Sequence, residues 1–111
     1  VFLKDFIADK TSWQAMITSG VADSAELLKQ KSRIENLMED DLGAFISDDN
    51  IITHIHYPLN TVPHKIASVK LDRRPIVAGT LTGIKGQYLI FSTGDVINIR
   101  SHAGYEVEID L

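Results

Sequence analysis

The sequence contains no cysteine among its 111 residues. Disulfide bonds and metal sites built on thiolates are therefore excluded, and a reducing compartment suits the chain. No apolar run approaches the roughly 20 residues that a membrane-spanning helix needs, and no segment has the pattern of an export signal. We therefore expect a cytoplasmic domain that does not contact a membrane.

Neither sign of charge dominates strongly, but the charges are unevenly distributed along the chain. The net charge is −4. Residues 1–50 carry five basic and ten acidic side chains, whereas residues 51–111 carry six basic and five acidic ones and all four histidines. Because the acidic half would repel phosphate groups, only the second half suits an anionic partner.

The composition is that of a globular protein, with 44% apolar and 23% charged residues and a mean hydropathy of +0.01. A chain of this length supports one hydrophobic core. It opens on the apolar run Val1-Phe2-Leu3, which resembles the continuation of an amphipathic element. We therefore expect a fragment of a longer protein.

The first fifty residues show helical periodicity. An apolar face begins the chain, a short turn follows with Thr11 or Ser12 as its cap, and a longer helix is predicted over 24–41 with Asp23 or Ser24 as its N-cap. Three acids at the end of that helix, Glu39-Asp40-Asp41, oppose the helix dipole. We interpret residues 1–50 as a helical segment, made of the end of an upstream domain plus a connecting helix.

From Ile51 the apolar period changes to two, which is typical of strands. Glycine-containing turns separate the apolar runs and allow positive φ angles. The strands expected on this pattern are 51–57, around 66–71, 75–82, 87–91, 96–100 and 105–111. The sequence thus predicts an α+β fold in which a small antiparallel β-domain of five to six strands, residues 51–111, forms a barrel-like or strongly curved sheet.

Two histidines, His54 and His56, share one face of the first expected strand. Two imidazoles at this spacing can reach one metal ion, although zinc needs a further ligand, such as His64 or His102. The alternative is that Ile55 and Tyr57 point inward while the two histidines face solvent. We favour this second interpretation and predict no metal and no cofactor.

A polar group on the later strands is a candidate ligand-binding surface. Its members are Lys85, Gln87, Asn98, Arg100 and His102. Guanidinium and ammonium groups bind anions, and amides and imidazoles add hydrogen bonds. A solvated outer face, with a cross-strand pair from Arg100 to Glu106 or Glu108, explains the same residues, and we favour this second interpretation.

Catalytic motifs are not evident. The glycines at 79, 83 and 86 lack the Lys-Ser/Thr of a phosphate-binding loop, and no serine lies in a nucleophile elbow. We predict no catalytic residue in this chain.

Several runs of the sequence resemble one known family. They are Ala8–Met16, Ile55–Pro58, Pro63–Ile66, Leu71–Asp72, Gly83–Phe91, Asn98–Arg100 and Gly104–Val107. Together they are similar to the C-terminal part of an uncharacterised bacterial family called domain of unknown function twenty-seven ninety-seven. The resemblance leaves out the helix at 20–50. Arg73-Arg74 departs from the family's usual Lys-Thr, and Asp95 lengthens the turn that follows Gly94.

The resemblance implies an upstream segment with a cysteine-rich, metal-binding stretch and a region similar to the GIY-YIG nuclease fold. Any nuclease-like chemistry would lie there, so we expect this chain to be a non-catalytic C-terminal module of a longer bacterial protein. One hypothesis is an accessory domain that binds nucleic acid or another anion. The other is a structural or homo-oligomerisation domain that completes the fold of the upstream part of the same protein.

Overall fold

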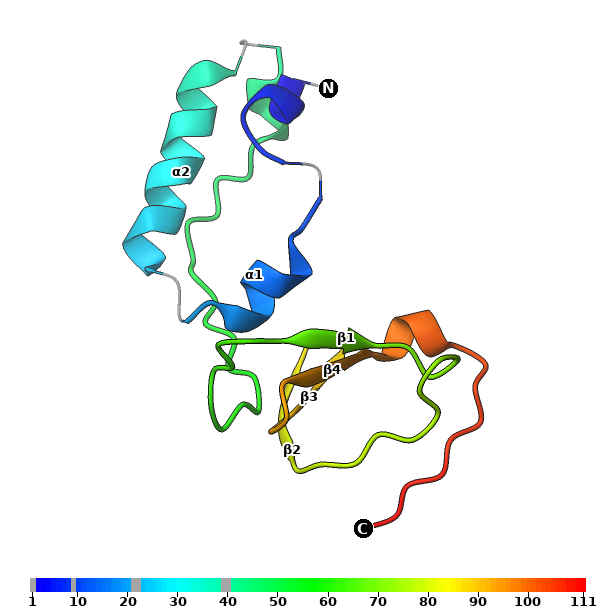
Figure 1. Ribbon diagram of the computed structural model, residues 1–111. Helices are drawn as coiled ribbons and strands as arrows, with labels where there is room; N and C mark the ends of the chain where they lie inside the picture. The colour runs from blue at the N-terminus through cyan, green and yellow to red at the C-terminus, as the bar shows by residue number, and fades with distance from the viewer. Residues whose placement is uncertain (1, 9, 21–22, 39–40) are drawn as a thin grey trace. The chain divides into compact units, whose positions relative to one another are not determined.

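The computed structural model describes residues 2–8, 10–20, 23–38 and 41–111 (Figure 1). The chain divides into two compact units. Residues 1–19 and 57–111 form the first, called here the β-unit, and residues 20–56 form the second, called the helical unit. The sequence-based division into two domains, residues 1–50 and 51–111, stays a prediction.

The β-unit begins with two short helical elements, the 3₁₀-helix η1 (Phe2–Asp5) and the α-helix α1 (Trp13–Thr18). Ser12 is the N-cap of α1, and its hydroxyl accepts a hydrogen bond from the Ala15 amide at 3.4 Å. This bond satisfies one of the amides that a helix start leaves free, which is why serine is favoured there. The predicted cap at Ser12 is confirmed.

The β-unit also contains a four-stranded sheet. Its strands are β1 (Ala67–Val69), β2 (Leu81–Lys85), β3 (Tyr88–Phe91) and β4 (Asp95–Asn98), in the spatial order β1-β4-β3-β2. The β2–β3 and β3–β4 pairs are antiparallel, but β1 runs parallel to β4. The α+β class is confirmed, and the predicted barrel was wrong, because the sheet is open. The sheet is mixed rather than antiparallel, and the expected five to six strands are not confirmed, since four strands pair among the described residues.

Three predicted strands are not formed. Residues 51–57, 75–80 and 105–111 have no regular strand structure. Residues 51–57 and 105–111 alternate as half-buried strands do, and 75–80 contains an apolar run. A strand also requires a partner for its backbone groups, however, and no sequence pattern identifies that partner. The turn expected at 83–86, between the predicted strands 75–82 and 87–91, was wrong at Gly83, since β2 passes through this residue, which forms an antiparallel bridge with Leu59.

Glycines close the two hairpins of the sheet, as predicted. Gly86, with φ of 58°, lies in the turn between β2 and β3, and Gly94, with φ of 87°, ends the turn between β3 and β4. A Cβ atom on Gly94 would lie 2.7 Å from the Lys65 carbonyl oxygen. Position 94 therefore requires glycine for its backbone conformation and for its close contact.

The core of the β-unit lies between α1 and the sheet. Ile17, Ile90 and Val96 are fully buried and pack together. Trp13 and Tyr88 border them, with ring centroids 5.5 Å apart and planes inclined by 16°. The short helix is thus held on the sheet by apolar contacts as well as by its cap.

The helical unit contains α2 (Ser24–Leu37) and the 3₁₀-helix η2 (Gly43–Phe45). Asp23 is the N-cap of α2, and its Oδ1 accepts a hydrogen bond from the Ala25 amide at 2.9 Å, as the sequence predicted. The helix ends at Leu37 rather than at residue 41. Of the three acids expected at its end, Glu39 and Asp40 lie outside the described residues.

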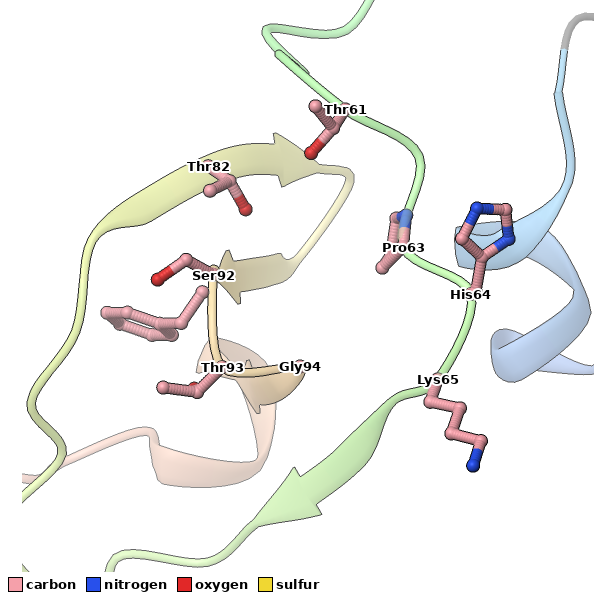
Figure 2. Close-up of a pocket in the computed structure, with 9 residues that line it drawn as sticks. Thr61, Pro63, His64, Lys65, Thr82, Ser92, Thr93 and Gly94 are labelled. Atoms are coloured by element: carbon pink, nitrogen blue, oxygen red, sulfur yellow. The ribbon is translucent and has the colours of Figure 1, made fainter.

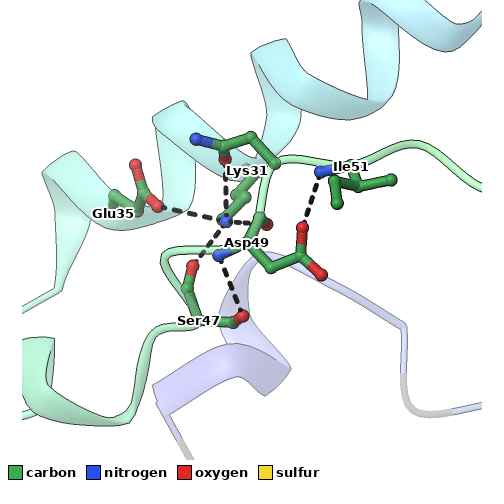
Figure 3. Close-up of polar contacts among 6 residues, drawn as sticks. Lys31, Glu35, Ser47, Asp49 and Ile51 are labelled. Carbon is green, nitrogen blue, oxygen red and sulfur yellow. Dashed lines mark hydrogen bonds and ion pairs between the residues drawn. The ribbon is translucent and has the colours of Figure 1, made fainter.

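Lys31 connects α2 to the segment that follows η2 (Figure 3). Its ammonium donates to the Ser47 carbonyl oxygen at 2.5 Å, the Asp49 carbonyl oxygen at 2.8 Å and Asn50 Oδ1 at 2.9 Å. Glu35 lies 4.0 Å away on the same helix. The side-chain oxygens of Ser47 and Asp49 in turn hold the loop, because they accept hydrogen bonds from the amides of Asp49 and Ile51.

Within the part of the chain that is described, no helix combines the length and the apolar character needed to cross a membrane.

Candidate functional site

The two candidate metal ligands, His54 and His56, lie in the helical unit on an irregular segment, and both are exposed. The other two histidines, His64 and His102, belong to the β-unit. In the described ranges, no group of three or more histidine, cysteine, aspartate or glutamate side chains could hold a metal ion. The strand that would have aligned the first two imidazoles is absent, so their shared face is absent too.

Lys85 is half-buried, and its ammonium makes hydrogen bonds within the β-unit. It is the last residue of β2, and its ammonium donates to the carbonyl oxygens of Met16 at 2.6 Å and Ser19 at 3.5 Å. It also lies 5.9 Å from the centroid of the Tyr57 ring. The last carbonyls of a helix have no partner within it and carry partial negative charge, and α1 has no basic residue in its last turn. Lys85 therefore caps α1 from the sheet.

Asn98 and His102 organise the 3₁₀-helix η3 (Ile99–His102), which follows β4. Asn98 Oδ1 accepts from the Arg100 amide at 3.1 Å and so caps the helix. His102 Nε2 accepts from the Leu71 amide at 3.1 Å, and Nδ1 lies 2.8 Å from the Asn98 carbonyl oxygen. Since an accepting Nε2 carries no hydrogen, Nδ1 must be the donor. Both side chains therefore maintain the local fold.

Gln87 and Arg100 complete the predicted surface. Gln87 is half-buried in the β2–β3 turn, and its carbonyl oxygen accepts from the Ile99 amide at 2.9 Å. Arg100 is exposed, and no ion pair links it to a described acidic residue. The expected pair with Glu106 or Glu108 was wrong, because residues 105–111 do not form a strand beside β4.

The bond from Leu71 to His102 connects η3 with a basic turn at residues 70–74. Lys70 and Arg73 are exposed in this turn. Arg74 pairs instead with Asp95, at 2.8 Å between Nη2 and Oδ2. The hydrogen bond from Arg74, aided by the Thr93 hydroxyl, holds the pKa of Asp95 below its usual value. No sequence signal predicted this pair, because its members are distant along the chain and belong to different elements.

Tyr105 is anchored beside the same turn. Its hydroxyl donates to Asp72 Oδ1, and its ring meets the His102 ring edge-on with centroids 5.2 Å apart. Because the neutral phenol is the form that donates, the bond raises the pKa of Tyr105. Beyond this anchor, residues 106–111 make no hydrogen bond to the described part of the chain.

A small pocket of about 170 Å³ lies between the loop at 61–65, β2 and the turn after β3 (Figure 2). Polar residues on its walls include Thr61, Thr82, Ser92 and Thr93. The hydroxyls of Thr82 and Thr93 already donate within the fold, to the Ile90 carbonyl oxygen and to Asp95. Lys65 extends away from these hydroxyls in Figure 2, so the pocket lacks a cation directed into it.

Residues 105–111 alternate apolar and acidic side chains. Tyr105, Val107, Ile109 and Leu111 alternate with Glu106, Glu108 and Asp110. All four apolar side chains are exposed, with Val107 at 62% and Ile109 at 77%. The prediction of a strand over 105–111 was wrong: the segment has the alternating pattern of a strand, but it pairs with no strand within the described residues.

A family model described as Protein of unknown function (DUF2797) matches residues 1–107. The match includes the helix at 20–50, which the resemblance above leaves out, so that limit was wrong. It gives no support to a position in the C-terminal part of a longer member. Comparison with curated proteins and with solved structures found no match.

Proposed function

We propose, from the premise that the chain belongs to the DUF2797 family of proteins of unknown function, that it is a non-catalytic interaction domain. The observation that supports this proposal is the unpaired apolar segment 105–111 of the β-unit. Apolar side chains that recur along one edge of a segment, without cover, are typical of surfaces that bind another protein.

The polar side chains of the β-unit support the same proposal. Lys85 caps α1, while Asn98 and His102 hold η3. Groups that already have hydrogen-bond partners inside the fold would have to give them up to bind a ligand, which costs free energy. The polar surface that the sequence suggested is therefore mostly engaged in maintaining the structure.

Sedimentation velocity tests the proposal. We expect the chain to self-associate, and we expect Val107→Ser/Ile109→Ser to remove the association while leaving the circular dichroism spectrum unchanged, since both side chains are exposed. Leu27→Ser is the control, because Leu27 is equally exposed at 62% but lies in the helical unit. A chain that is monomeric and binds no dye specific for exposed apolar surface would overturn the proposal.

A second candidate is the binding of an anion such as nucleic acid. It is favoured by the bond from Leu71 to His102, which brings the turn of Lys70 and Arg73 beside the exposed Arg100. This basic group, made of Lys70, Arg73 and Arg100, differs from the surface that the sequence predicted. Arg100 belongs to both sets, whereas Lys85 belongs only to the predicted surface. The net charge of −4 opposes it.

Fluorescence anisotropy with labelled single-stranded and duplex oligonucleotides separates the two candidates. If the basic group binds a phosphate backbone, affinity should fall steeply with salt and should fall further in Arg73→Ala/Arg100→Ala. Lys29→Ala is a matched control, because Lys29 is an exposed lysine of the acidic helical unit. No binding at low salt would exclude this candidate.

A further inference from the structure

We infer that segment 105–111 adds as a strand to the open edge of β1 in a second copy of this chain, and that the two copies exchange these segments reciprocally. This inference rests on the proposed function and names its partner. Two features of the β-unit, an unpaired strand sequence and an unpaired sheet edge, carry it.

The two edges of the sheet differ. At the β2 edge, residues 58–60 provide cover, because the Ile84 amide donates to the Pro58 carbonyl oxygen at 2.8 Å and the Asn60 amide donates to the Thr82 carbonyl oxygen at 2.9 Å. At the other edge, β1 pairs only with β4 among the described strands. The β1 edge is thus the one that remains open for another strand.

The open edge presents unpaired backbone groups. The Ala67 amide donates toward β4, to the Gly94 carbonyl oxygen at 2.9 Å. Because successive residues of a strand direct their backbone groups to opposite sides, the N–H and C=O of Ser68 face away from β4. Ser68 is exposed and the strand contains no proline, so an added strand can reach these groups.

Segment 105–111 has the residue pattern of the partner strand that this edge lacks. Its alternation gives one apolar and one acidic face in the extended conformation. Unlike β1, it pairs with no described strand, and in Figure 1 it runs away from the sheet. Addition to a sheet edge would satisfy its backbone and cover Val107 and Ile109.

Charge complementarity identifies the partner as a second copy. Lys65 and Lys70 are exposed on either side of β1, and Glu106, Glu108 and Asp110 lie on the segment. Opposite charges on adjacent strands favour pairing and like charges oppose it. Since each copy carries one basic edge and one acidic segment, two copies can satisfy each other in a closed two-fold arrangement.

Charge reversal in separate chains tests the inference. One variant carries Lys65→Glu/Lys70→Glu and the other carries Glu106→Lys/Glu108→Lys. Alone, each would place like charges together, and we expect dimerisation to weaken by about tenfold or more in each. Mixed in equal amounts, they should recover the wild-type dimer, because both interfaces of the heterodimer then pair opposite charges. A Lys4→Glu/Lys10→Glu variant controls for net charge, since neither lysine flanks β1 or belongs to the segment.

The outcomes distinguish the possibilities. If Val107→Ser/Ile109→Ser disrupts the dimer but the charge variants dimerise as the wild type does, the proposed function stands and the strand exchange is wrong. If the wild type is monomeric while the Ser68 and Glu108 amides are protected from exchange, the segment pairs within its own chain and the inference is overturned. A monomer without this protection overturns both the inference and the self-association on which it rests.

Discussion

Among the described residues, five apolar side chains are buried in the β-unit, whereas none is buried in the helical unit. The buried set is Ile17, Val69, Ile90, Val96 and Ile97. The helical unit instead relies on the hydrogen bonds of Lys31, and its large apolar residues Leu27 and Phe45 are 62% and 84% exposed. The two units should therefore respond to different perturbations.

The largest effect should come from the core of the β-unit. Ile90 is fully buried, so Ile90→Ala removes apolar contacts and leaves a cavity. We expect it to lower the free energy of unfolding by about 3 kcal/mol. Leu27→Ala, at an exposed position of α2, should change it by less than about 0.5 kcal/mol. Urea unfolding followed by circular dichroism measures both, and equal losses would refute the contrast between the units.

The next effect concerns the turn between β3 and β4. Gly94→Ala places a Cβ in a left-handed backbone conformation and against the Lys65 carbonyl oxygen, and we expect a cost of about 2 kcal/mol. Gly86→Ala has the positive φ but open space around it, so it isolates the backbone term. Gly43→Ala in the helical unit has neither feature and should be nearly neutral. Thermal unfolding of the three variants should rank them in this order.

The difference between the units also explains how much the sequence could predict. Local signals succeeded: the caps Ser12 and Asp23 and the turn glycines Gly86 and Gly94 are determined by nearby residues. The prediction of which strands pair failed, because the parallel pairing of β1 with β4 joins segments that are far apart in the chain. For the same reason, alternation alone could not show that 105–111 lacks a partner.

At the candidate site, too, local features could be predicted from the sequence and contacts between distant segments could not. The residue types on the predicted surface suit anion binding, and Arg100 is indeed exposed. The carbonyls that Lys85 meets, however, come from α1, and the amide that His102 meets comes from the turn after β1. A single sequence shows which groups can donate or accept, but it does not show which distant backbone groups already occupy them.

In the helical unit, Lys31→Met should be the most damaging polar substitution. It keeps an apolar stem of similar length but removes the bonds to Ser47, Asp49 and Asn50, so we expect a loss of about 1–2 kcal/mol. Amide hydrogen exchange should then accelerate about tenfold in α2 but remain unchanged in β3. Lys29→Met is the control, because the Lys29 side chain is 77% exposed and, among the described residues, it pairs only with Glu26. Equal acceleration in both units would contradict their independence.

A smaller effect is expected in acid, and it should be confined to the β-unit. The bond from Arg74 lowers the pKa of Asp95, so the unfolded chain takes up this proton at a higher pH than the folded one. The stabilisation is therefore fully present above the unfolded pKa and is lost as the pH falls through the folded pKa. The stability difference between wild type and Asp95→Asn should shrink over that range in denaturant titrations. If the stability difference between the two proteins does not change with pH, Asp95 contributes through its shape alone and not through its charge.

The smallest effect should be found in alkali, because Tyr105 and Asp72 are both exposed to water. Their hydrogen bond raises the pKa of Tyr105, so its stabilisation is complete below the unfolded pKa of the phenol and is lost as the pH rises through the folded one. Tyr105→Phe keeps the ring contact with His102 but cannot donate. We expect the variant to lack this alkaline loss, whereas Tyr57→Phe, whose ring faces Lys85, should retain it. Ultraviolet titration of the phenols, combined with unfolding at each pH, would show whether this hydrogen bond of Tyr105 holds the start of segment 105–111. If the alkaline loss of stability is the same in Tyr105→Phe as in the wild type, only the ring contact with His102 anchors the segment.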